Sequence, residues 1–131
     1  MALIPCAASA AAAPKTETVA MSWTVVGNDL QLTATTLKHG SAYVDSWSCT
    51  PSCSLVASTS LSSDGYFISV ATLSAPASGD YEFTYAITMT AGKSDIQWTG
   101  ENSVIISVDR SDGLLHVKGK ILNKHMDNNT S

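Results

Sequence analysis

Two of the three cysteines are close enough in the chain to act together. Cys49 and Cys53 are separated by Thr-Pro-Ser, a spacing that suits a disulfide across a tight loop and is equally compatible with two free thiols. A zinc site would need a second cysteine or histidine pair, and none follows in the sequence. Cys6 has no partner by count, and we interpret it as a small apolar residue or an intermolecular contact.

Other residue types that perform catalysis do not occur in recognisable arrangements. The histidines are far apart and form no metal-ligating pair; they are His39, His116 and His125. Asp64, Asp80 and Glu82 offer carboxylates for acid–base chemistry, but turns between strands use Asp in any case. The chain has no G-x-S-x-G elbow and no phosphate-binding or dinucleotide motif. We therefore expect a protein that is not an enzyme and uses no metal or cofactor.

The three tryptophans are the remaining candidates for contacts with a ligand or a partner. Trp23, Trp47 and Trp98 each lie in a run that resembles a strand, so most of them are expected in the core or at a subunit contact. Trp98, beside Thr99 and Gly100, is the best candidate for an exposed aromatic side chain that could contact a sugar.

The charge of the chain argues against nucleic acid as a partner. Seven Lys and Arg stand against eleven Asp and Glu, a net charge of −4, and phosphate-binding surfaces need the opposite balance. The nearest basic group is Lys118, Lys120 and Lys124, which we interpret as a solvated strand face.

The first residues form an alanine-rich segment. Residues 2–14 read ALIPCAASAAAAP, which is too short to span a bilayer and is interrupted by Pro5 and Pro14. The basic region of a signal peptide is absent. We interpret residues 1–18 as an extended arm, and expect no membrane span.

Alternation of side chains dominates the rest of the chain. In residues 81–89 the large side chains fall at every second position, with small or polar residues between them. A helix would scatter these residues around its axis, whereas a strand places them on one face. The core is expected to contain Trp47, Phe67, Tyr81, Phe83, Tyr85, Ile87, Val104 and Ile106.

The same pattern predicts an all-β protein of one domain. Short strands with turn signals between them are typical of a β-sandwich or a small barrel. The expected strands are 19–26, 30–37, 42–48, 54–57, 66–73, 81–90, 96–99, 103–108 and 114–121.

One stretch resembles a known class of domain. Gly79-Asp80-Tyr81-Glu82-Phe83-Thr84-Tyr85-Ala86-Ile87 is similar to the penultimate core strand of immunoglobulin-like domains of the bacterial and phage-borne kind. The resemblance covers residues 19–109 and implies an immunoglobulin-like antiparallel β-sandwich. It implies that the Tyr81 hydroxyl reaches back to the backbone of the preceding connection, and that Trp47 is a core residue of the third strand. The cysteine of antibody domains is missing from residues 81–90.

Residues 110–131 extend beyond the expected sandwich as an extra strand and a tail. Leu115, Val117 and Ile121 form an apolar face that is costly to leave in water. We expect this strand to add to a sheet edge, and favour the edge of a neighbouring subunit. Together with Leu3 and Ile4 of the arm, these three residues are the predicted assembly contacts.

These features suggest a protein that acts through contacts with other proteins. We expect a structural or decorating component of a virus-like particle, such as a phage capsid or tail, whose partners are further copies or a particle protein and whose location is the virion. The alternative is a secreted or cell-surface bacterial module for adhesion or carbohydrate recognition. A disulfide between Cys49 and Cys53 would favour this alternative.

Overall fold

The computed structural model describes residues 15–37, 42–90 and 97–122, and all of their regular structure is β. The strands are β1 (Lys15–Glu17), β2 (Ala20–Val26), β3 (Asp29–Leu37), β4 (Ala42–Thr50), β5 (Val56–Leu61), β6 (Tyr66–Ser74), β7 (Gly79–Thr90), β8 (Gln97–Asp109) and β9 (His116–Ile121). The described residues include no helix long and apolar enough to cross a membrane.

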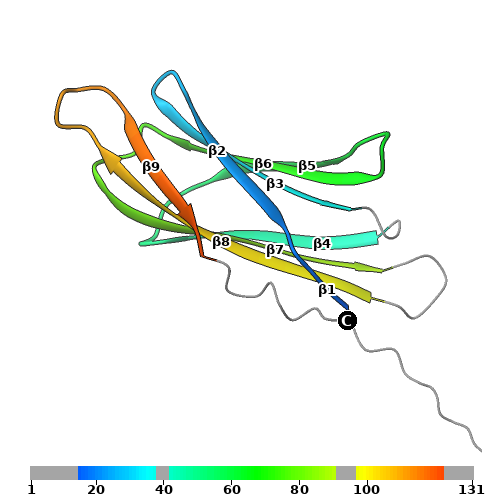
Figure 1. Ribbon diagram of the computed structural model, residues 1–131. Helices are drawn as coiled ribbons and strands as arrows, with labels where there is room; N and C mark the ends of the chain where they lie inside the picture. Colours follow the sequence, from blue (N-terminus) through cyan, green and yellow to red (C-terminus); the bar gives the residue numbers. More distant parts are fainter. Residues whose placement is uncertain (1–14, 38–41, 91–96, 123–131) are drawn as a thin grey trace, which may run out of the picture.

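The strands form two sheets that face each other (Figure 1). One sheet has the order β2-β3-β6-β5. The other has the order β8-β7-β4, and its β8 edge is shared by β1 and β9. All pairings are antiparallel except that of β1 with β8. The expected all-β sandwich is therefore confirmed.

The core lies between the sheets and is built by the alternation that the sequence shows. Six of the residues expected there are buried: Phe67, Phe83, Tyr85, Ile87, Val104 and Ile106. Trp47 and Tyr81 are only partly buried and pack against this core. Trp47 lies on the edge strand β4 and Tyr81 lies near the start of β7, so the two sheets do not enclose either side chain completely. The Tyr81 hydroxyl donates to the Ala77 carbonyl oxygen at 2.8 Å, as the resemblance implied.

The last sheet strand before the C-terminal segment is longer than expected. The sequence analysis placed two short strands on either side of Gly100, but β8 runs without interruption through this residue. Gly100 is paired with Ile87 of β7 and Glu17 of β1. A glycine inside a strand weakens its local propensity, and here the neighbouring strands on both sides supply the missing stabilisation. The short edge strand expected at 54–57 is β5, at Val56–Leu61.

The C-terminal strand pairs within its own chain. β9 is antiparallel to β8, with Val117 opposite Val108 and Gly119 opposite Ile106. The preference for a neighbouring subunit was therefore wrong. A hairpin closes through a short connector at a small entropic cost, whereas pairing between chains depends on concentration.

The expected boundary of the N-terminal arm also differs. Residues 1–18 were assigned to the arm, yet β1 pairs parallel with Trp98–Gly100 and so belongs to the sheet. Three residues are too few to show an alternating pattern, which is why the sequence did not indicate a strand. Between the β8 residues that pair with β1 and those that pair with β9 lies Asn102, whose buried side chain donates to the Val19 carbonyl oxygen at 3.1 Å.

Candidate functional site

One hollow of the described residues lies between β4 and β5, the strands that end the two sheets on one side. β4 pairs only with β7 and β5 only with β6, so each has one edge with no strand partner in the described part of the chain. A hollow of about 530 Å³ runs between them. This β4–β5 groove is lined by Asp45, Ser46, Trp47, Ser48, Cys49, Cys53, Leu55, Ala57, Ser58 and Thr59.

The loop that joins β4 to β5 is closed by a disulfide. Cys49 and Cys53 are bonded, with their Cα atoms 5.7 Å apart, within the range that disulfides require. The sequence left the disulfide and free thiols as alternatives, and the structure shows the disulfide. Cys49 lies on the inward face of β4, two positions after Trp47, so the bond borders one end of the β4–β5 groove.

A chain of hydrogen bonds crosses the groove and ends on a carboxylate. Trp47 Nε1 donates to Ser69 Oγ at 2.8 Å, and the hydroxyl oxygens of Ser69 and Thr59 are 2.9 Å apart. Thr59 Oγ1 also contacts Asp45 Oδ2, and the Tyr85 hydroxyl donates to the same oxygen at 3.0 Å. An ionised carboxylate can only accept hydrogen bonds. The single Thr59 proton is therefore donated to Asp45.

Strand register explains how these residues meet. Alternation turns Asp45 and Trp47 toward the opposite sheet, with Trp47 directly across from Tyr85 on β7. Thr59 on β5 lies across from Ser69 on β6. Four strands from both sheets therefore contribute polar side chains to one margin of the sandwich.

Burial and charge act together on Tyr85. Loss of solvent and the neighbouring Asp45 carboxylate both raise the pKa of the Tyr85 hydroxyl, burial being the larger cause. The phenol therefore stays protonated and acts as a donor to Asp45. Its ring also packs on Trp47, with the ring centroids 5.0 Å apart. Tyr85 thus fixes the position of both side chains.

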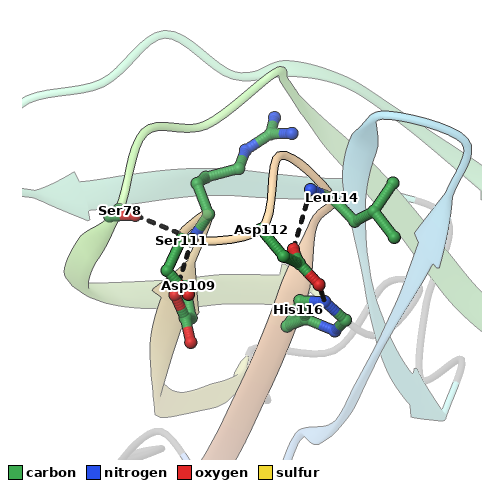
Figure 2. A network of polar contacts seen from close by, with 7 residues as sticks. Ser78, Asp109, Ser111, Asp112, Leu114 and His116 are labelled. Atoms are coloured by element: carbon green, nitrogen blue, oxygen red, sulfur yellow. Dashed lines mark hydrogen bonds and ion pairs between the residues drawn. The ribbon is translucent and has the colours of Figure 1, made fainter.

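A second polar network lies in the connector from β8 to β9 and in the loop beside it (Figure 2). In the connector from β8 to β9, Asp109 accepts from the Ser111 N–H and Asp112 from the Leu114 N–H, at 2.8 and 2.9 Å. These backbone donors are the main cause that lowers the pKa of each carboxyl. Asp112 Oδ2 lies 2.7 Å from Nε2 of His116. The network therefore shapes the connector from within.

Arg110 extends that network to two other loops. Its backbone N–H donates to the Ser78 hydroxyl at 2.8 Å, and its Nε donates to the Pro76 carbonyl oxygen at 2.8 Å. Its Nη1 contacts the Asn28 side chain in the β2–β3 turn. The guanidinium thus links its own connector to the β6–β7 and β2–β3 loops. These hydrogen bonds give Arg110 a structural role at this end of the sandwich.

A second hollow lies beside this connector. It measures about 600 Å³ and runs between β2 and the β8–β9 hairpin. Val25, Leu115 and Val117 give it an apolar wall, with His116 and Lys118 at its rim. Nothing on the described part of the chain indicates what would fill it.

The sites predicted from the sequence are distributed over the whole molecule. Trp98 was expected as an exposed aromatic, whereas the structure shows it half-buried and packed against the core. Leu115 and Val117 are also half-buried against the core, and Ile121 is the most exposed of the three at 38%. Leu3 and Ile4 lie outside the described residues, as do His39 and His125. Of the predicted assembly contacts, the structure therefore describes only the three of the C-terminal segment, and these lie at alternating positions of one stretch of chain.

Sequence reasoning singled out Trp47, Cys49 and Cys53, but it missed the polar residues that meet beside them in the β4–β5 groove. One signal was present: Asp45 occupies an inward position in the alternation of β4, between Tyr43 and Trp47. A charged residue on an inward face needs partners, and its position could have marked a polar site. Its partners Thr59 and Tyr85 are distant in the chain, and no local pattern indicates them.

The described residues contain no group of three or more side chains that could hold a metal ion. Comparison with known protein families, with curated proteins and with solved structures found no match to this chain.

Proposed function

We propose that this chain is an exported binding module that acts outside the reducing cytoplasm and contacts its partner through the β4–β5 groove. The Cys49–Cys53 disulfide carries the proposal. Disulfides persist on secreted proteins, cell surfaces and virions, and are rare in the cytosol. Both cysteines line the groove. The loop that needs an oxidising environment to form its disulfide is therefore also part of the proposed binding surface.

We also propose that the sandwich is immunoglobulin-like. The order β2-β3-β6-β5 opposite β8-β7-β4 supports this, since such domains place four strands in one sheet and three in the other in this sequence. The hydrogen bond from Tyr81 to Ala77 supports it further, because a tyrosine corner occurs at this point of the fold. Domains of this architecture present binding surfaces on loops and sheet margins.

Binding, and not catalysis, suits the chemistry of the groove. Of the described residues that line it, Asp45 is the only one with a titratable group, because both cysteines are oxidised. General acid–base catalysis generally needs a second group with a different pKa. Asp45 instead lies among hydroxyls and an indole, an environment that positions a hydrogen-bond acceptor.

The proposal is tested by measuring retention of the oxidised chain on intact bacterial cells and on extracellular polysaccharide and protein matrices, by cosedimentation. Ser58 lines the groove and is exposed, so Ser58→Trp should block the groove without entering the core. Ser22 is an exposed serine on the edge strand β2 of the same sheet, and Ser22→Trp is the matched control. We expect the wild type and Ser22→Trp to be retained and Ser58→Trp to be lost. Equal behaviour of all three proteins would contradict the proposal.

A second candidate is the structural or decorating component of a virus-like particle. Val44 and Val56, on the edge strands β4 and β5, are 75% and 77% exposed. Free edges that carry exposed apolar side chains invite strand addition by another chain. This function predicts self-association or binding to a particle protein. Native mass spectrometry of the oxidised chain distinguishes it, because an isolated binding module should remain monomeric.

A further inference from the structure

The two oxygens of the Asp45 carboxylate have different surroundings. Oδ2 accepts hydrogen bonds from Thr59 and Tyr85, whereas no described residue donates to Oδ1. Asp45 is half-buried, and Oδ1 is not among the buried polar atoms that lack a partner. Oδ1 therefore keeps contact with solvent, and Asp45 is one of the residues that line the β4–β5 groove.

The inner oxygen is held so firmly that the outer one has a fixed position. The chain from Trp47 through Ser69 and Thr59 delivers one donor to Oδ2, and Tyr85 delivers another. Connected polar networks of this kind make side chains rigid. A ligand that donates to Oδ1 therefore does not have to order the carboxylate, which removes part of the entropic cost of binding.

The other residues that line the groove are neutral, some of them polar and some apolar. Ser46, Ser48 and Ser58 are exposed and line it. Leu55, the indole of Trp47 and the disulfide add apolar surface beside them. A ligand that matches this lining has hydroxyl groups on its edges and a C–H face between them. The volume of about 530 Å³ lies within the usual range for small-molecule sites, about 300–1,000 Å³.

We propose that the β4–β5 groove binds a neutral carbohydrate, with a sugar hydroxyl donating to Asp45 Oδ1. This inference rests on the proposed binding function and specifies the ligand class of the same groove. A sugar ring can use each kind of group in this groove. Its hydroxyls can donate to the Asp45 carboxylate and bond to protein hydroxyls, and its C–H face can pack on the Trp47 indole.

Two other readings of Asp45 explain less. An inward-pointing charge on an edge strand protects that edge from pairing with another chain, but this role does not require the hydrogen-bonded chain from Trp47 or the open Oδ1. A lysine or arginine of a protein partner would also bind a carboxylate beside an indole. However, the described lining offers a cation only one carboxylate, and two donors already compensate its charge on Oδ2.

The test uses the full oxidised chain on an array of neutral and acidic oligosaccharides, followed by calorimetric titration with the neutral sugar that binds best. We expect saturable binding that Asp45→Asn weakens about tenfold or more, since hydrogen bonds to an ionised acceptor are the strong ones. Because Asp45→Asn alters the internal network, its urea midpoint is measured alongside. Ser58→Trp, which leaves the network intact, should abolish sugar binding, and Ser22→Trp should not affect it.

The possible failures are distinguishable. If Ser58→Trp loses retention on cells while no neutral sugar binds, the binding function stands and the carbohydrate ligand is refuted. Binding of lysine- or arginine-rich peptides in place of sugars, with the same dependence on Asp45, would likewise overturn the inference in favour of a cationic protein partner. If Ser58→Trp were retained on cells and matrices as well as the wild type and Ser22→Trp, both proposals would be refuted.

Discussion

A substitution of Phe83 tests directly which face of β7 points into the core. Its side chain has no exposed surface and lies in the core between the two sheets. We expect Phe83→Ala to lower the free energy of unfolding by about 3–5 kcal/mol, through lost burial and the cavity left behind. Urea denaturation measures this loss. Val56→Ala, at a highly exposed position, should change stability by less than about 0.5 kcal/mol. A loss below about 1 kcal/mol for Phe83→Ala would contradict the observed orientation of β7.

The raised pKa of Tyr85 makes stability depend on pH in the alkaline range. Below the pKa of an unfolded tyrosine, about 10, both states keep the proton and the folded protein has its full stability. Above that pH the unfolded state loses the proton while Tyr85 in the folded state, shielded by burial and beside Asp45, retains it. The free energy of unfolding should then fall with rising pH, by up to about 1.4 kcal/mol per unit.

This effect is isolated by comparing the wild type with Tyr85→Phe between pH 9 and pH 11. All other titrating groups are common to both proteins, so the steeper decline of the wild type measures Tyr85 alone. Parallel stability curves would show that Tyr85 ionises equally easily in both states.

Among elements, β9 depends on a close approach that only glycine permits. A Cβ atom at Gly119 would lie 2.5 Å from the Trp23 ring and 2.6 Å from the Ile106 side chain. We expect Gly119→Ala to displace β9 from β2 and to cost about 1–3 kcal/mol, the usual range for overpacking. Lys118→Ala, at an exposed neighbouring position, is the control and should be nearly neutral.

Amide hydrogen exchange on dilute monomer gives the structural readout. Because β9 pairs with β8 of the same chain, the amides of β9 should be protected at concentrations where no assembly forms. Gly119→Ala should reduce that protection selectively. Exchange of β9 as fast as in an unfolded peptide would mean that this strand needs another subunit.

For the whole molecule, the sandwich should unfold as one unit even when the disulfide is removed. The bond closes a loop with a sequence separation of four at the sandwich margin. The Cys49→Ser, Cys53→Ser double variant should lose roughly 2 kcal/mol by the loop-entropy relation. Tryptophan fluorescence and far-ultraviolet circular dichroism should still report one coincident transition, because both sheets share a single core. Two separate transitions would show that β8–β9 or the β4–β5 margin folds independently.

The sequence alone determined the fold class and the inward face of its main strands. Alternation is a local property, since successive side chains of any strand point to opposite sides, and so Phe83, Ile87 and Ile106 could be assigned to the core before the structure was known. The bond from the Tyr81 hydroxyl to the Ala77 carbonyl oxygen was implied by the resemblance of residues 79–87 and is found, although Tyr81, which was expected in the core, is only partly buried.

Only the tertiary structure decided which strands are neighbours and where a ligand could bind. The pairing of β9 with its own β8 depends on a competition between closing a short loop and meeting another chain, which no sequence pattern records. Asp45 meets Thr59 and Tyr85 across separations of 14 and 40 positions. Contacts of this range arise from the stacking of two sheets, and the β4–β5 groove therefore became visible only in the folded molecule.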